Sequence, residues 1–301
     1  MPKHRLAAAA LLVIALSLVG GRAEAGAGAK PIWFYRAEDA AGRVTFFYPS
    51  FHLRDPRVPR PPMTMLDSVR SLVLEADIVA AKAHREALMP YLLGPKPRDL
   101  ATLFTAAEVA RIRARADCNG LGGAVERLRL SFIATIIALP CPKAGGEEGG
   151  SYEEGVELAA QQRGLKITGL ESAEEEFAAL TGLPDRLFIG EIKAMAAHPD
   201  RADQMIDRMI VSYNDGDLDG LYALMLSDGP KNAADRKLFI QKVLLDRNRH
   251  MVERLQDVLA DGNALVIVGA LHFPGTGGIL DLLKQQGFRV TRIDGSDGAL
   301  R

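Results

Sequence analysis

A continuous apolar run near the C-terminus constrains the fold of this chain more than any other stretch. Residues 263–278 read NALVIVGALHFPGTGG, so the apolar residues 264–268 lead directly into Gly269, and His272 follows. A short apolar run of this kind predicts a buried strand, and the proline and glycines after it predict a turn that opens a helix. Residues 288–294 then predict a last strand, which we expect to pair in parallel with the first through a right-handed crossover.

Helical and strand patterns alternate along the rest of the 301-residue chain. Residues 31–39 and 42–53 are rich in aromatic and β-branched residues and predict a β-hairpin. Apolar residues recur at helical spacing in 64–76, and residues 77–83 predict a short strand. Most of 98–142 and 185–260 is predicted to be helical, and a strand is expected to end at Glu171. The pattern predicts an α/β fold: a central mixed sheet with flanking helices and a large helical insertion.

The first residues of the chain have the pattern of a secretory signal peptide. Lys3 and Arg5 precede an apolar stretch, and Ala23 and Ala25 then form an A-x-A cleavage pattern. We therefore predict that residues 1–25 are removed and that 26–301 form a single domain in the periplasm or outside the cell. The alternative is an uncleaved membrane anchor, but the apolar stretch is shorter than the roughly 20 residues of a spanning helix. No stable membrane span is expected after cleavage.

Charge and cysteine content narrow the classes of function. The formal net charge is −1 and the chain has no basic run, so a nucleic-acid partner is not expected. The chain has two cysteines, Cys118 and Cys141. Export to an oxidising compartment favours a disulfide between them, and two buried thiols are the alternative.

Two histidines are expected where strands end. His272 follows the buried strand 264–269, and His52 follows the second strand of the predicted hairpin. Ligands of α/β sheets bind outside the carboxyl ends of the strands, so both imidazoles are candidate site residues. A lone histidine in this position is also commonly a hydrogen-bonded structural residue. The glycines at Gly275 and Gly277 predict free amide groups at a helix N-terminus, which would suit an anion.

Four short motifs follow one another along the chain. They are Leu170–Ser172, Gly216–Asp217, the pair Arg247 and Asn248, and G-x-x-H at Gly269–His272, which is the strongest of them. This ordered set resembles the TraB/GumN family, whose animal relatives are the Tiki membrane proteases. The resemblance covers nearly all of residues 26–301.

This resemblance implies a metal-dependent hydrolase. In the family's proposed mechanism the two G-x-x-H histidines and a glutamate bind a divalent metal such as Mn, Co or Zn, which activates water. The ligands implied here are His52 and His272. The chain departs from the pattern at Pro49, which replaces the first motif's glycine, and at Lys82, which we align with the family's glutamate.

The substitution at Lys82 leaves two hypotheses open. In the first, the chain is an exported hydrolase or peptidase, and either Glu171 or His84 completes the metal site. In the second, it is a catalytically inactive member in which Lys82 replaces the metal's charge and the cleft binds a small anionic or peptide ligand. Arg247 and Asn248 are candidate polar groups of that cleft. Haem binding, suggested by a weaker likeness to another protein class, has no supporting C-x-x-C-H motif.

Overall fold

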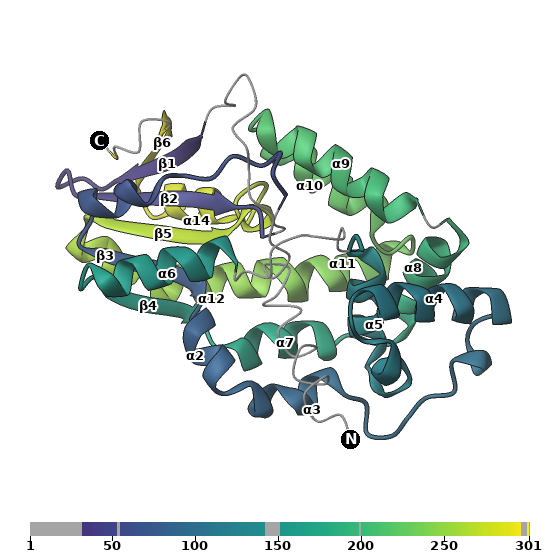
Figure 1. The fold of residues 1–301 in the computed structure, drawn as a ribbon. Helices are drawn as coiled ribbons and strands as arrows, with labels where there is room; N and C mark the ends of the chain where they lie inside the picture. Colours follow the sequence, from purple (N-terminus) through teal and green to yellow (C-terminus); the bar gives the residue numbers. More distant parts are fainter. Residues whose placement is uncertain (1–31, 53–54, 142–150, 199, 296–299, 301) are drawn as a thin grey trace.

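The computed structural model describes residues 32–52, 55–141, 151–198, 200–295 and 300. A six-stranded sheet lies at one end of the molecule and helices surround it (Figure 1). The strands are β1 (Trp33–Glu38), β2 (Val44–Ser50), β3 (Ser71–Ala76), β4 (Lys166–Glu171), β5 (Ala264–Gly269) and β6 (Arg289–Asp294). The predicted α/β fold with a mixed sheet is confirmed.

The order of the strands places the apolar run in the middle of the sheet. The order is β4-β3-β5-β2-β1-β6, and β5 pairs in parallel with both β2 and β3. The predicted hairpin is confirmed, because β1 and β2 pair antiparallel. The predicted pairing of the two C-terminal strands is wrong: β6 pairs antiparallel with β1 at the sheet's edge, and β2 and β1 lie between it and β5. The handedness rule for crossovers does not determine which strand pairs with which. Here β2 of the hairpin already lies beside β5, so β6 pairs with β1 instead.

Helices account for most of the remaining described residues. They are α2 (Ile78–Ala83), α3 (Met89–Leu92), α4 (Ala106–Cys118), α5 (Leu130–Ala138), α6 (Tyr152–Gln162), α7 (Ala173–Thr181), α8 (Arg186–Ala197), α9 (Arg201–Asn214), α10 (Leu218–Asp228), α11 (Ala233–Ile240), α12 (Asp246–Arg254), α13 (Gln256–Asp261) and α14 (Ile279–Gln285). A π-helical turn, Gln241–Leu245, joins α11 to α12. The prediction that most of 98–142 and 185–260 is helical is confirmed for the described residues of these ranges.

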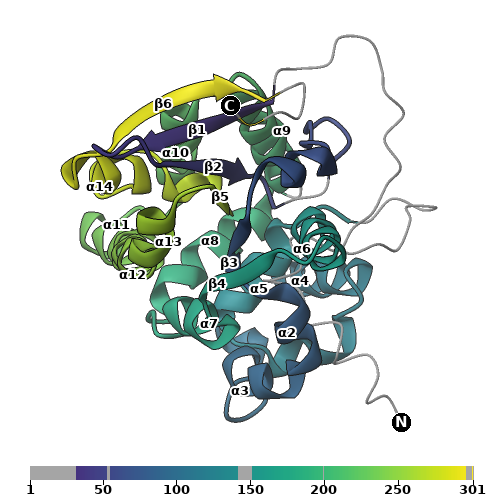
Figure 2. The same cartoon turned by 90° about the vertical axis from the view of Figure 1, so that its left-hand side faces the viewer.

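Alternation along the strands builds a core on each face of the sheet. On β5, Leu265 and Ile267 pack with α6 on one face, whereas Val266 and Val268 pack with α12 and α14 on the other. Successive side chains of a strand point to opposite faces, so a strand covered on both sides reads as a continuous apolar run. Figure 2, turned by 90°, shows α12 and α14 on one side of the sheet and α6 on the other.

A separate helical core lies beyond the carboxyl ends of the parallel strands (Figure 1). It packs α4, α5 and α8 together around Phe132, Ile133 and Ile192. The predicted disulfide is present: Cys118 and Cys141 are joined with their Cα atoms 5.4 Å apart. Their separation of 23 residues corresponds to about 3 kcal/mol of stabilisation in the chain-entropy model.

The secondary structure predicted for residues 64–83 is wrong, because the strand comes first and the helix follows it. A 3₁₀ turn, Met63–Ser68, leads into strand β3, and residues 78–83 form helix α2. Asp77 caps this helix by accepting a hydrogen bond from the Ala80 amide at 2.7 Å. An aspartate before an apolar run is a helix start signal, and here it outweighs the β-propensity of Ile78 and Val79.

The predicted signal peptide, residues 1–25, lies outside the described residues and remains a prediction. Among the residues that the structure does describe, no helix is both long enough and apolar enough to cross a membrane.

Candidate functional site

The carboxyl ends of four parallel strands bring a cluster of polar side chains together. β2 leads to His52, β5 leads to His272, and Glu75 and Glu171 stand near the ends of β3 and β4. Glu75 and His272 are buried, with exposed fractions of 9% and 5%. The His52 side chain is 37% exposed, so solvent reaches the cluster at this residue.

Glu75 lies at the centre of the cluster. Its Oε2 accepts a hydrogen bond from the Gly269 amide at 2.7 Å and lies 3.5 Å from Nε2 of His52. Its Oε1 lies 3.5 Å from Nε2 of His272 and 2.5 Å from Nη2 of Arg247. Both imidazoles therefore point their Nε2 atoms at opposite oxygens of one carboxylate.

The other ring nitrogen of each histidine is held by a hydrogen bond. Nδ1 of His272 lies 2.6 Å from Oδ1 of Asn248, whose amide nitrogen donates to the Gly277 carbonyl at 2.9 Å. Nδ1 of His52 lies 3.2 Å from Oε1 of Glu153. Both partners are acceptors, so each Nδ1 carries a proton, and each Nε2 faces the Glu75 carboxylate.

Burial and charge act differently on the two histidines. Burial lowers the pKa of His272. Burial opposes protonation of His52 too, but its hydrogen bonds with Glu153 and Glu75 outweigh that effect and raise its pKa well above the usual value. The pKa of Glu75 is held well below its usual value, because the charges of His272 and Arg247 outweigh the effect of burial. Glu75 is therefore an ionised acceptor at neutral pH.

Gly269 is needed for close approach rather than for an unusual backbone angle. Its φ is −54°, which any residue can adopt. A Cβ at this position would lie 2.6 Å from Nε2 of His52 and 3.2 Å from Oε2 of Glu75. A glycine here makes room for the imidazole and the carboxylate.

Arg247 ties the two strand-end glutamates together. Its Nε donates to Oε2 of Glu171 at 2.9 Å, and its Nη2 donates to Glu171 at 2.6 Å and to Glu75 at 2.5 Å. All three side chains are nearly inaccessible, with exposed fractions of 10% for Arg247, 11% for Glu75 and 4% for Glu171. Burial makes this pairing obligatory, because an unpaired charge in the interior is costly.

Two residues predicted for the site lie away from the histidine pair. Lys82 stands on α2, not at a strand end, and its ammonium group pairs with Glu154 of α6. His84 is exposed and follows the last residue of α2. The alignment that put Lys82 in place of the glutamate depended on a strand at 77–83. In the structure the strand of this region is β3, which ends at Ala76 and carries Glu75.

One of the two amides expected to bind an anion has a partner within the chain. The Gly277 amide donates to Oδ2 of Asp281 at 2.7 Å. Gly275 and Gly277 have positive φ angles of 76° and 77°, which shape the turn after His272. The role of Gly277 is therefore structural: it turns the chain and presents its carbonyl to Asn248.

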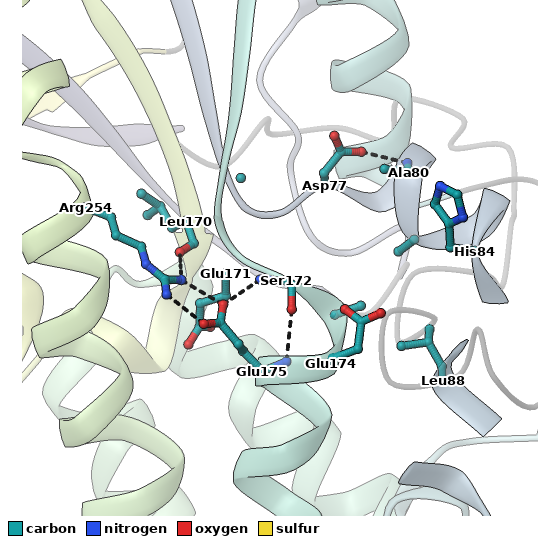
Figure 3. A pocket seen from close by; sticks show the side chains of 13 residues that line it. Asp77, Ala80, His84, Leu88, Leu170, Glu171, Ser172, Glu174, Glu175 and Arg254 are labelled. Carbon is teal, nitrogen blue, oxygen red and sulfur yellow. Dashed lines mark hydrogen bonds and ion pairs between the residues drawn. The ribbon is translucent and has the colours of Figure 1, made fainter. Parts of the chain in front are cut away.

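A cavity of about 500 Å³ lies beside the cluster and shares Glu171 with it (Figure 3). Its walls come from the end of β4, from Asp77 after β3, and from α2 and α7, and Leu88 and Leu170 supply apolar surface. Arg254 closes one side, donating to Glu175 at 2.6 Å and 2.7 Å, and this pairing lowers the pKa of Glu175 to about 2. Figure 3 shows His84 on the side of the cavity away from Arg254.

A further carboxylate beside the cavity has an unusual pKa. Glu157 of α6 accepts hydrogen bonds from the amides of Ile78 and Val79 at the start of α2. Burial and the nearby charge of Asp77 raise its pKa from 4.5 to about 7. The folded state therefore keeps this proton to a higher pH than the unfolded chain does.

We expect the variant Glu157→Gln to gain stability relative to the natural chain as pH rises. The unfolded chain loses the proton near pH 4.5 and the folded chain near pH 7, so stability linked to this group is present below pH 4.5 and lost between these values. The variant should gain up to about 3 kcal/mol on the natural chain between pH 4.5 and pH 8. Urea unfolding at both pH values measures the difference, with Glu86→Gln on the surface as the control. An unchanged difference would contradict this assignment.

Sequence reasoning missed two residues of the cluster, Glu75 and Glu153. A helix start signal at Asp77 would have ended the preceding strand at Ala76 and placed Glu75 beside its end. The buried residues of α6 are Glu153, Val156, Glu157 and Ala160. These positions have the spacing of the buried face of an amphipathic helix, where apolar residues are expected. A carboxylate at position 153 was therefore a detectable exception to this pattern.

The cluster has the donor types of a two-histidine, one-carboxylate metal site. Neutral imidazoles and a carboxylate suit Zn, Mn or Co, and the hydrogen bonds at both Nδ1 atoms are the outer contacts that such ligands need. Across the described residues, no group of three or more His, Cys, Asp or Glu side chains is already arranged to hold a metal ion. In the geometry present, Arg247 compensates part of the charge of Glu75.

The comparisons with known proteins identify the family. The model of the TraB/PrgY/gumN family matches residues 33–292, which include strands β1 to β5, most of β6, and both histidines. No curated protein matches the chain, and no solved structure matches it. The match extends over most of the chain, and the chain therefore belongs to the TraB/PrgY/gumN family.

Proposed function

We propose that this protein is a metal-dependent hydrolase of the peptidase type, acting in the periplasm or outside the cell. His52, His272 and Glu75 would be the metal ligands. The observation that carries the proposal is the convergence of both Nε2 atoms, each 3.5 Å from an oxygen of Glu75, with both Nδ1 atoms held by acceptors. Divalent Mn, Co or Zn, when bound, would supply Lewis-acid polarisation of the scissile bond and lower the pKa of water.

The chain's own residues prepare this centre. Asn248 and Glu153 keep the protons of the two histidines on Nδ1, and the Gly269 amide orients Glu75. Arg247 stabilises the ionised state of Glu75 and is itself positioned by Glu171. Glu171 thus acts through Arg247. The adjoining cavity has the volume to accept a peptide side chain, and His84 would meet the substrate rather than the metal.

The alternative, an inactive member that holds an anionic ligand, is less well supported. It needs an uncompensated cation in the cleft, and Lys82 was the candidate. The charge of Lys82 is compensated by Glu154, and the charge of Arg247 is compensated by Glu75 and Glu171. A bound anion would have to break one of these pairs.

Metal binding by the purified chain tests the proposal. We expect about one equivalent of Zn²⁺, Co²⁺ or Mn²⁺ per chain by elemental analysis and calorimetry, and loss of this binding in the double variant His52→Ala, His272→Ala. The control is the double variant His198→Ala, His250→Ala, since both of these side chains are exposed. Chelator-sensitive cleavage of a mixed peptide library would then report hydrolysis. Absence of binding at micromolar metal in the natural chain would refute the metal-dependent function.

A further inference from the structure

The Glu153 carboxylate reaches the histidine cluster from outside the sheet. It stands in the first turn of α6, after the cap residue Ser151, whose hydroxyl accepts the Glu154 amide at 2.8 Å. Glu153 is buried, with an exposed fraction of 4%. Its Oε1 meets two groups at the carboxyl end of β2, Nδ1 of His52 at 3.2 Å and the hydroxyl of Ser50.

Stability alone does not explain a carboxylate in this position. Its second oxygen, Oε2, is buried with no hydrogen-bond partner among the described residues. An unsatisfied buried polar atom costs about 1–3 kcal/mol, and an apolar residue would continue the buried stripe of α6 at no such cost. The arrangement therefore sacrifices stability to hold a carboxylate oxygen against Nδ1 of His52.

We propose that Glu153 is a positioning residue that holds the proton of neutral His52 on Nδ1 and so leaves the Nε2 lone pair available to a metal ion. A neutral imidazole can carry its proton on either nitrogen, and only an acceptor on Nδ1 leaves Nε2 free as a lone pair. His52 is the histidine that needs this support most, because its side chain is 37% exposed whereas that of His272 is 6% exposed and held by Asn248. Ser50 holds the carboxylate in place by donating to the same oxygen.

The inference deepens the proposed function, on which its metal-binding part rests. The two histidines then have different outer partners, a carboxylate on His52 and a neutral amide on His272. A carboxylate partner makes an imidazole the stronger donor, so His52 would contribute more to metal affinity than its exposure suggests. Outer hydrogen-bond partners of this kind change metal affinity by about 10–100-fold.

Ring-nitrogen NMR of ¹⁵N-histidine-labelled full chain tests the tautomer without depending on metal. The sample is treated with chelator and measured at an alkaline pH at which His52 is neutral. We expect His52 to carry its proton on Nδ1 in the natural chain and to show a mixture of tautomers in Glu153→Ala. Glu153→Gln preserves the side-chain volume if the alanine variant does not fold, and its amide, which both donates and accepts, should also give a mixture. An unchanged Nδ1–H tautomer in both variants would overturn the inference.

Zn²⁺ affinity is the second readout. We expect about 10–100-fold weaker binding in Glu153→Ala, with the thermal transition retained, and binding within twofold of the natural chain in the control Glu154→Gln. Glu154 is the next residue of α6 and pairs with Lys82 instead of His52. Affinity within threefold of the natural chain in Glu153→Ala would contradict the positioning role. If the natural chain binds no metal, the proposed function fails, and the NMR result still decides whether Glu153 sets the tautomer.

Discussion

Replacement of Arg247 by alanine is expected to lower the free energy of unfolding by about 3–5 kcal/mol. The guanidinium group is the shared partner of Glu75 and Glu171, and its removal leaves two carboxylates buried beside each other. Nearby, burial already raises the pKa of Glu176 to about 7, and the charge of Arg247 opposes this rise. Loss of the arginine should therefore also drive one of these carboxyl groups to take up a proton.

The control is Arg249→Ala, two residues further along α12. Arg249 is exposed and pairs with Asp246, so its loss should cost less than about 1 kcal/mol. Urea unfolding followed by circular dichroism measures both variants. Equal effects of the two substitutions would contradict the placement of Arg247 as the buried counter-charge of the cluster.

Gly269→Ala is expected to abolish metal binding, with at least about 100-fold loss of affinity, while the fold is retained. The new Cβ would lie 2.6 Å from Nε2 of His52 and 3.2 Å from Oε2 of Glu75, so the imidazole must leave the position from which it faces the carboxylate. The nearest atom is the far end of a flexible and partly exposed side chain. The strain is therefore relieved by movement of His52 rather than by unfolding.

Gly190→Ala is the matched control, because no other side chain packs closely against this glycine. It lies within α8, and a Cβ there would meet no atom within 4 Å. Alanine should raise the free energy of unfolding by about 0.5–1 kcal/mol and leave metal affinity unchanged. Zn²⁺ titration of both variants separates the two outcomes, and a Gly269→Ala protein that binds Zn²⁺ normally would show that His52 is not a ligand.

Local sequence patterns were sufficient for the elements whose signals agree. The run at 264–269 is a strand because its residues are apolar on both faces, and α4 begins after Thr105, whose capping box with Glu108 is visible in the sequence. The cysteine pair also formed as expected. In these cases the secondary-structure propensity, the hydrophobic periodicity and the capping or turn residues all indicate the same structure.

Residues 64–83 show why the carboxylate of the site was misplaced. Residues 71–76 are a strand and 78–83 a helix, the reverse of the expectation, because the parallel pairing of β3 with β4 and β5 outweighs the helical spacing of its leucines. Because the prediction exchanged these two elements, it placed the end of the strand near Lys82 instead of near Glu75. One error of secondary structure thus became an error about the chemistry of the site.

The sequence by itself determined that this chain folds around a buried parallel strand, that His272 follows this strand, and that the family is TraB/PrgY/gumN. These properties depend on neighbours along the chain, and a hydrophobic pattern or a short motif reports them directly. Only the tertiary structure decided that Glu75 meets both histidines and that Glu153, from a helix 101 residues away in sequence from His52, holds one of them. Contacts between side chains on separate elements depend on strand order and helix placement, because these determine which strand ends share one edge of the sheet.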